Sequence, residues 1–377
     1  LHIVPSGIFF PNVECFIGAG TLISCRSLVK EIEELEASGV STARLHLSNR
    51  AHIVLPFHLL LEEINEEFRK TGKLGTTRQG IGPGYASTFA RWGIRFCDLQ
   101  ELGYARNIVQ TVVERYNHVL SAFDHPPIDW KNVFEELMQY VSRLYPYLCD
   151  TESLLSEYLE SGKRVLLEGQ LGVMRDIDWG MYPYVTSSFP CPGGILQGAG
   201  VSPRYVTAII AVVKTYSTAV GGGPMVAELK GEEAERLRTL GREFGATTGR
   251  PRRCGWLDLV TLRHLKVTSA PTQLALTKID VLSNYDAIPV CVAYDKSGKQ
   301  SDTMLHTHEL EGAKPVLKQF QGWGHVSDWR NASPAQTKAI GHYVKAIEVA
   351  AGASVTIMSY GPERDATQVI GSLGLWG

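Results

Sequence analysis

Several features that would place a protein in a special class are missing from this chain. Its 377 residues contain no apolar run near the ~20 residues that a membrane-spanning helix needs, no secretory signal and no internal repeat. The seven cysteines form no CxxC pair and no close framework, which favours reduced cytosolic thiols over disulfides. The net charge is −2, so the chain also lacks the basic excess of a general nucleic-acid binder.

What is present is the composition of an ordinary globular protein, with 44% hydrophobic and 20% charged residues. A chain of this length can bury a large core as one big α/β domain or as two modest domains. Apolar spacing predicts helices at 28–37, 57–70, 87–95, 228–240 and 334–350 and through most of 98–161. Short apolar runs predict strands at 45–47, 53–55, 163–167, 274–280 and 355–358, and a buried strand or helix segment at 206–213.

Residues 241–258 concentrate charge, hydroxyl groups and glycine in a few turns. Two neighbouring hydroxyls, Thr247 and Thr248, precede the guanidinium groups of Arg250, Arg252 and Arg253. Arginine offers a planar fork of donors that matches carboxylate or phosphate, and glycines let a ligand approach the backbone closely. The stretch therefore predicts a loop that closes on a small, multiply anionic molecule. An ordinary basic surface turn is the alternative.

A second turn, at 74–85, is dense in glycine and threonine. Backbone N–H groups that glycines leave open can bind a phosphate where a helix begins, and Thr76 and Thr77 stand beside them. The helix that we expect next carries Arg91 and Arg95. A plain tight turn explains the same residues equally well.

Two predicted strands end in residues that suit a purine base. The strand at 274–280 ends in Lys278-Ile279-Asp280, and the one at 355–358 runs into the turn 359–365. Ligands of open α/β sheets lie beyond the carboxyl ends of strands. An Asp carboxylate can accept hydrogen bonds from both N1–H and N2–H of guanine while a Lys stem covers the base, and GTPases use a similar Lys-x-Asp. A chance occurrence of this short motif is the alternative.

Three histidines recur every six residues, at His46, His52 and His58. The spacing hints at a metal site, but no second motif supports it. We therefore favour core or hydrogen-bonded histidines.

Taken together, the motifs resemble those of the adenylosuccinate synthetase family. The ordered matches lie at 5–8, 75–77, 80–83, 176–178, 182–188, 243–250, 255–258, 276–280 and 359–362. The resemblance implies a P-loop-NTPase-like α/β fold, with one large domain over 1–377 around a mostly parallel central sheet with flanking helices. It also implies a cytoplasmic homodimer that binds neither nucleic acid nor membrane.

The reaction that the resemblance implies is the GTP-dependent ligation of IMP and L-aspartate to adenylosuccinate, with magnesium, on the way from IMP to AMP. GTP phosphorylates the purine 6-oxygen, and the aspartate amine then displaces that phosphate. A bidentate arginine–carboxylate clamp would position the amine and so lower the entropic part of the barrier.

The resemblance also assigns ligands to residues of this chain. The aspartate ligands are Thr247, Thr248, Arg250 and Arg252. The IMP ligands are Thr77, Arg91, Thr186 and Arg250, with Arg91 reaching the site of the neighbouring subunit. The GTP ligands are Arg252, Lys278, Asp280, Ser359, Gly361 and Pro362.

One departure from the family pattern concerns catalysis. The family opens with Gly-Asp-Glu-Gly-Lys-Gly-Lys and a following Gly-His-Asn-Ala-Gly-His, which supply the catalytic Asp and His, the phosphate loop and most magnesium ligands. Neither segment occurs in 1–377, and the chain begins at Leu1 without an initiator Met. We therefore expect an N-terminally incomplete chain without catalytic residues or metal ligands of its own, inactive as written because phosphoryl transfer needs that loop.

A second departure lies on the IMP side, where Leu171, Arg175 and Ala219 replace a usual amide, leucine and arginine. An arginine in place of a leucine changes both charge and volume. Two alternatives therefore stand beside the first reading. One is a ligase with an altered purine acceptor, and the other is a non-catalytic paralogue that binds nucleotide or dimerises with an active subunit.

Overall fold

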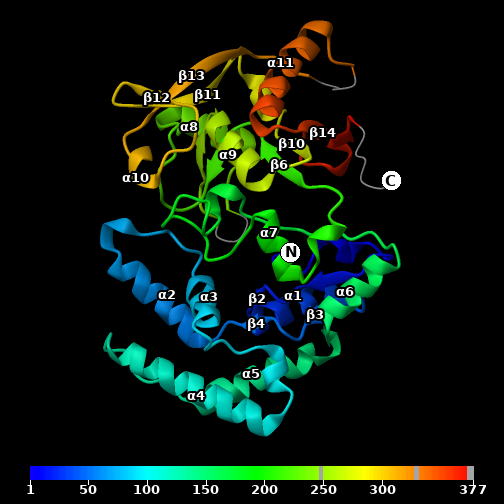
Figure 1. Ribbon diagram of the computed structural model, residues 1–377, viewed down its shortest axis with the longest axis vertical. Helices are drawn as coiled ribbons and strands as arrows, with labels where there is room; N and C mark the ends of the chain where they lie inside the picture. The colour runs from blue at the N-terminus through cyan, green and yellow to red at the C-terminus, as the bar shows by residue number, and fades with distance from the viewer. Residues whose placement is uncertain (246–248, 327–330, 372–377) are drawn as a thin grey trace. The chain divides into compact units, whose positions relative to one another are not determined.

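The computed structural model describes residues 1–245, 249–326 and 331–371. The chain divides into two compact units, each with its own hydrophobic core (Figure 1). The first unit comprises Leu1–Gln170 and Thr186–Tyr205, and the second comprises Leu171–Val185 and Val206–Gly377. The assignment of 1–377 to one domain stays a prediction.

The first unit is built from short parallel strands and seven α-helices among its described residues. One sheet has the order β1 (Cys15–Ile17), β3 (Leu45–Ser48), β5 (Leu148–Cys149), and a separate pair joins β2 (Leu22–Ile23) to β4 (His52–Ile53). The helices are α1 (Cys25–Ala37), α2 (Pro56–Phe68), α3 (Ile81–Phe89), α4 (Leu102–Ser121), α5 (Trp130–Leu144), α6 (Thr151–Glu160) and α7 (Pro192–Ala199). Helix α5 packs against both α4 and α1.

Helix α1 shows why the sequence folds this way. Its N-terminus is capped by Ser24, whose hydroxyl accepts a hydrogen bond from the N–H of Ser27. The residues spaced as predicted, Leu28, Ile32 and Leu35, are all buried. The prediction of a helix at 28–37 is confirmed.

The second unit contains two larger sheets. In the first, β10 (Gln273–Thr277) pairs in parallel with both β6 (Ile210–Lys214) and β14 (Ser354–Ser359), and β15 (Thr367–Val369) lies antiparallel to β14. In the second, β11 (Ala287–Lys296) pairs antiparallel with β12 (Lys299–Ser301) and β13 (Lys314–Gln321) and parallel with β9 (Leu257–Asp258). A short antiparallel pair joins β7 (Ser217–Ala219) to β8 (Arg253–Gly255).

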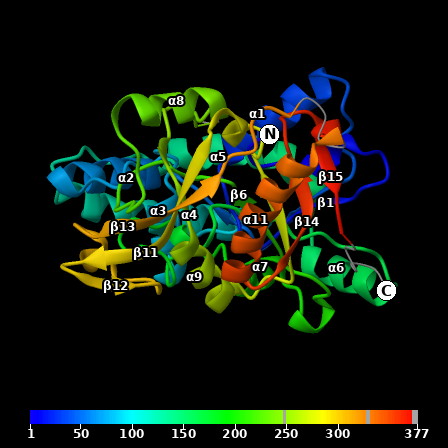
Figure 2. The same cartoon turned by 90° about the horizontal axis from the view of Figure 1, so that it is seen from above.

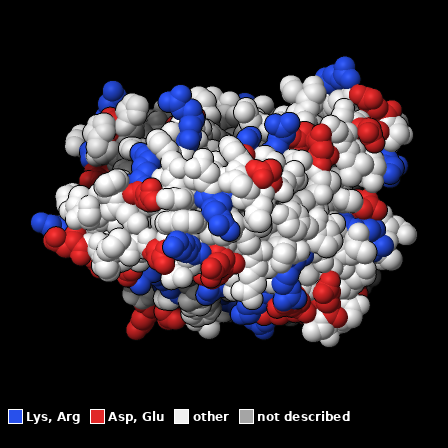
Figure 3. Space-filling model, turned by 90° about the horizontal axis from the view of Figure 1, so that it is seen from below, with Lys and Arg blue, Asp and Glu red and all other residues white. Residues whose placement is uncertain are grey.

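The helices of this unit lie beside those sheets. They are α8 (Gly231–Gly241), α9 (Leu259–Ser269), α10 (Thr307–Leu310) and α11 (Pro334–Ala351). Helices α9 and α11 pack against each other, and Figure 2 shows α11 running beside β14. On the face of the molecule drawn in Figure 3, basic and acidic side chains are mixed, in keeping with the net charge of −2.

The predicted strand at 163–167 is wrong. In the structure these residues belong to no strand, and the side chain of Leu166 is 87% exposed. An apolar run becomes a strand only where a neighbour completes its backbone hydrogen bonds, and among the described residues no strand pairs with this segment. The apolar segment at 206–213 contributes β6, which lies at an edge of its sheet and leaves Val212 73% exposed.

The predicted helix at 87–95 is also wrong in its limits, because α3 ends at Phe89. The N–H of Arg91 donates to the carbonyl of Thr88 and the N–H of Trp92 to that of Ser87, while Arg91 has a left-handed φ of 63°. This pair of bonds is the Schellman motif, which usually places glycine at the left-handed position. With an arginine there, the sequence gives no stop signal before Gly93.

Two of the three regularly spaced histidines are hydrogen-bonded parts of the first unit. The Nε2 of His46 lies 2.8 Å from a carboxylate oxygen of Glu14. The buried His58 accepts the N–H of Leu55 at Nδ1, so its Nε2 carries the proton and donates to the Ser87 hydroxyl at 2.8 Å. Among the described residues, no three His, Cys, Asp or Glu side chains form a group that could hold a metal ion.

We predict that His58 makes stability fall in acid. Burial lowers the pKa of His58 from 6.5 to about 3. As pH falls below 6.5, His58 is therefore protonated in the unfolded chain while it stays neutral in the folded chain. The stabilisation is complete above that value and is lost by about 1.4 kcal/mol per pH unit on acidification. Urea unfolding should show wild type losing about 2 kcal/mol more than His58→Gln between about pH 6.5 and 5.

The exposed His118 provides the control for this measurement. The variant His118→Gln should follow the wild-type pH dependence. If the free energy of unfolding depends equally on pH in wild type and His58→Gln, folding does not lower the pKa of His58.

Candidate functional site

Three parallel strands of the second unit, β6, β10 and β14, have their carboxyl ends at the same edge of their sheet. Because β6 and β14 both run parallel to β10, the residues that follow them are brought together. These residues include Lys214 at the end of β6, Lys278 and Asp280 after β10, and Ser359 at the end of β14. The edge collects the polar groups that the sequence predicts for a base pocket.

The turn after β10 is fixed by hydrogen bonds from both neighbouring strands. Thr215 donates its N–H to the carbonyl of Thr277 at 3.0 Å and its hydroxyl to that of Lys278 at 2.8 Å. On the other side, the N–H of Ile279 lies 3.5 Å from the carbonyl of Ser359. These contacts hold Lys278 in a left-handed conformation with φ 67°, which a lysine rarely adopts.

Asp280 presents an acceptor that the described protein does not use. Its Oδ1 is buried and has no hydrogen-bond partner among the described residues. A buried acceptor without a partner costs roughly 1–3 kcal/mol, so the position favours a ligand that donates to it. The neighbouring Lys278 donates from Nζ to the carbonyl of Gly241 at 2.9 Å.

The turn after β14 completes this edge. The hydroxyl of Ser359 donates to the carbonyl of Gly361 at 3.1 Å, and the N–H of Tyr360 donates to the carbonyl of Ala366. Pro362 is exposed on the same turn. The structure thus brings Ser359, Gly361 and Pro362 to the same sheet edge as Lys278 and Asp280.

The predicted loop at 241–258 is closed at its neck by paired backbone. A bridge joins Phe244 to Pro251, and the N–H of Arg252 donates to the carbonyl of Glu243 at 2.9 Å. The side chain of Arg250 is exposed, whereas Thr247 and Thr248 lie outside the described residues. The loop therefore leaves and rejoins the fold at one fixed point.

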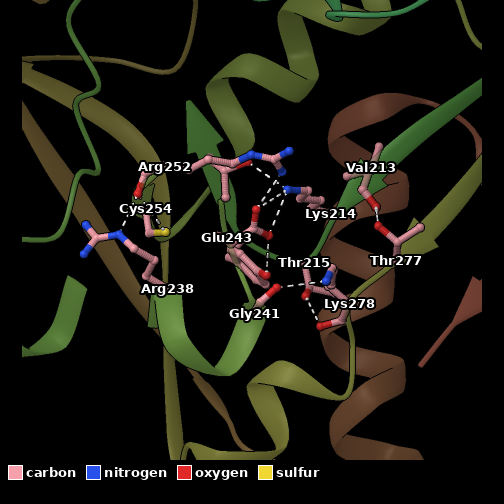
Figure 4. A network of polar contacts seen from close by, with 12 residues as sticks. Val213, Lys214, Thr215, Arg238, Gly241, Glu243, Arg252, Cys254, Thr277 and Lys278 are labelled. Atoms are coloured by element: carbon pink, nitrogen blue, oxygen red, sulfur yellow. Dashed lines mark hydrogen bonds and ion pairs between the residues drawn. The ribbon is translucent and has the colours of Figure 1, made fainter. Parts of the chain in front are cut away.

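A buried carboxylate holds this point together (Figure 4). Glu243 is 1% exposed and accepts hydrogen bonds from Lys214 at 2.9 Å, from the hydroxyl of Tyr216 at 2.7 Å and from Arg252 at 2.8 Å. Burial acts to raise the pKa of Glu243, but the bonds from Lys214 and Tyr216 outweigh it and lower the pKa. Burial lowers the pKa of Lys214 against the attraction of the same carboxylate.

Arg175, one of the residues that depart from the family pattern, lies beside the glycine-rich bend 220–223. Arg175 donates to the carbonyls of Tyr184, Val220 and Gly222. Burial, and then the charge of Arg253, lower the pKa of Arg175. The arginine therefore fixes backbone around the bend.

The other two departures have different surroundings. Ala219 ends β7 and pairs with Arg253 of β8. Leu171 is 60% exposed and has a left-handed φ of 84°, which is rare for a bulky side chain.

In the predicted phosphate-binding turn of the first unit, side chains of helix α2 already accept hydrogen bonds from backbone N–H groups. Carboxylates of α2 accept the N–H groups of Leu74 and Gly75 at Glu66, and that of Gly80 at Glu62. The expectation that glycines leave these N–H groups open is therefore wrong. The turn is exposed at Thr77 and held in shape by the helix below it.

Two further predicted IMP ligands lie at opposite ends of α3. Thr186 shares a hydrogen bond of 3.2 Å with the hydroxyl of Ser188, and a Cβ added at Gly82 would lie 3.5 Å from the hydroxyl of Ser187. The segment 186–188 therefore lies beside the start of α3. Arg91 follows the end of that helix and is exposed.

Sequence reasoning missed the two residues that organise the loop neck, Lys214 and Glu243. Lys214 ends an apolar segment, and a single charge at the end of a strand was the available signal. In the sequence Glu243 lies near several arginines, where a carboxylate indicates no more than charge balance. Only the fold shows that Lys214 and Arg252, distant in sequence, meet at Glu243.

Within the part of the chain that the structure describes, no helix is long and apolar enough to cross a membrane. The sequence of residues 1–368 matches the family model of adenylosuccinate synthetase. The fold also resembles cyanophage S-2L succinoaminodeoxyadenylate synthetase bound to dGMP and dATP as an energy donor. The identity is 16% and the TM-score 0.58, over 98% of this chain and 80% of that chain, which shows a shared fold alone.

A stronger similarity is to the fully ligated adenylosuccinate synthetase of Plasmodium falciparum. The two chains are 32% identical, and the TM-score is 0.90 over 98% of this chain and 88% of that chain. This match lends no support to the predicted N-terminal truncation, which stays a prediction. The chain therefore belongs to the adenylosuccinate synthetase family, and this membership confirms the predicted α/β fold, the ligase class and the GTP-dependent joining of IMP to L-aspartate.

Proposed function

We propose that the sheet edge formed by β6, β10 and β14 binds the guanine base of GTP. The observation that carries this proposal is the buried Oδ1 of Asp280, which lacks a partner among the described residues. Guanine places two donors, N1–H and N2–H, side by side, and one carboxylate can accept from both. Adenine has no such pair of donors, so the site would select GTP over ATP.

In this proposal the loop that begins at Gly241 binds the aspartate co-substrate. Arg250 and Arg252 would pair with its carboxylates, together with Thr247 and Thr248. The guanidinium fork matches a carboxylate and holds the amine in position for attack. The hydrogen-bonded loop neck at Glu243 supports this role, because it fixes the backbone from which the side chains of both arginines extend.

The remaining parts of the proposal concern the other partners. Thr77, Thr186, Arg91 and Arg250 would bind IMP, with Arg91 reaching across a homodimer in the cytoplasm. The exposed position of Arg91 after α3 supports its availability to a second subunit. Magnesium would accompany the GTP phosphates, but no suitable group of three ligands lies among the described residues, so none of them is assigned to the metal.

A ligase with an altered purine acceptor is the second candidate function. It is favoured by Arg175, which is half-buried and donates to backbone carbonyls of the bend 220–223, where a leucine is usual. Turnover assays with IMP and with GMP as acceptors separate the two candidates. Aspartate-dependent turnover with IMP alone supports the first, and turnover with GMP alone supports the second.

Replacing Asp280 should relax the preference for guanine. In Asp280→Asn one acceptor becomes a donor that faces N1–H, so GTP affinity should fall by ~1.5–3 kcal/mol while ATP affinity changes little. Calorimetric titration with each nucleotide measures both. The exposed Asp286 gives a matched control, and Asp286→Asn should bind as wild type does. Undiminished discrimination in Asp280→Asn would refute the base pocket.

Replacing Arg250 should affect the amino-acid substrate alone. In a catalytically active form of the enzyme, Arg250→Leu removes one charged partner of the aspartate carboxylate, which costs ~1.5–3 kcal/mol and raises the KM for L-aspartate accordingly. The affinity for GTP should stay near that of wild type. Arg242→Leu, an exposed arginine at the other end of the loop, is the control. Equal losses for aspartate and GTP would contradict the assigned role.

A further inference from the structure

We infer that Glu243 is a positioning residue that couples the aspartate loop to the GTP site. It binds Arg252 at the end of the loop and Lys214 at the end of β6, and so it fixes both cations at once. The inference rests on the function proposed above for these two regions. It adds the side chain through which ligand binding in one region affects ligand binding in the other.

The geometry uses the whole carboxylate. Oε1 accepts from Lys214 at 2.9 Å and from Tyr216 at 2.7 Å, while Oε2 accepts from Lys214 at 2.9 Å and from Arg252 at 2.8 Å. A carboxylate offers about four lone-pair positions, and these four bonds fill them. Neither cation can move without breaking a charge-assisted hydrogen bond.

The turn that carries Glu243 is also tied to the base pocket. The carbonyl of Gly241, two residues earlier, accepts from Lys278 at 2.9 Å (Figure 4). This turn is closely packed against Tyr216, since a Cβ added at Gly241 would lie 2.2 Å from the Tyr216 hydroxyl. A base that displaces Lys278 therefore bears on the same short segment as a ligand that displaces Arg252.

The outer side of the loop neck is held as well. Arg238 of α8 donates from Nε to the carbonyl of Arg252 at 2.9 Å. Arg252 is thus fixed by its N–H, its carbonyl and its guanidinium, and two of these three bonds are made to Glu243. Loss of the carboxylate charge leaves two neighbouring cations without their shared counter-ion, while the backbone bond remains.

The test compares Glu243→Gln with Glu232→Gln, the same change at an exposed position of α8. We expect Glu243→Gln to raise the KM for L-aspartate and the Kd for GTP each by about tenfold or more, and Glu232→Gln to change neither. Combining Glu243→Gln with Arg252→Gln should give less than the product of the two single losses. A lowered Tm with unchanged KM and Kd, or single losses that multiply, would overturn the inference.

Hydrogen exchange in the ligand-free full chain separates this inference from the proposed function. Glu243→Gln should speed exchange in peptides covering both 249–254 and 211–216, whereas Glu232→Gln should not. Failure of the wild type to bind GTP would refute the proposed function and leave this comparison valid. Faster exchange in only one of the two segments, or in neither, would overturn the coupling.

Discussion

The parallel pairing of β10 with β6 and β14 is the constraint on which the site depends. It places the residues after three separate strands at one edge, although they lie far apart in the sequence. The turn at Lys278 keeps a left-handed backbone because Thr215 bonds to it from one neighbouring strand. Without that alignment, Asp280 and Ser359 would have no reason to lie near each other.

The same edge anchors the arginine-rich loop. Lys214 ends β6 and meets Glu243, which in turn holds Arg252. A sheet made rigid by backbone hydrogen bonds thereby sets the starting position of a loop that is itself long and rich in glycine. In the proposed function, the base pocket and the base of the aspartate loop are therefore parts of one hydrogen-bonded scaffold.

Local chemistry could be predicted from the sequence where a residue acts through its own strand or helix. The apolar face of α1 follows from the spacing of Leu28, Ile32 and Leu35, and the polar end of β10 follows from Lys278 and Asp280. Most of what failed depended on partners outside the predicted element itself. Among the described residues no strand pairs with the segment 163–167, carboxylates of α2 accept N–H groups of the glycine turn at 74–80, and Glu243 meets Lys214 only in the folded chain.

The most direct test of the account is a crystal structure of this chain with GDP bound. The account predicts the guanine base at the carboxyl edge of β10, with N1–H and N2–H donated to the carboxylate of Asp280 and the turn 359–362 beside the ring. A base bound elsewhere, or bound at this edge with no hydrogen bond to Asp280, would contradict it.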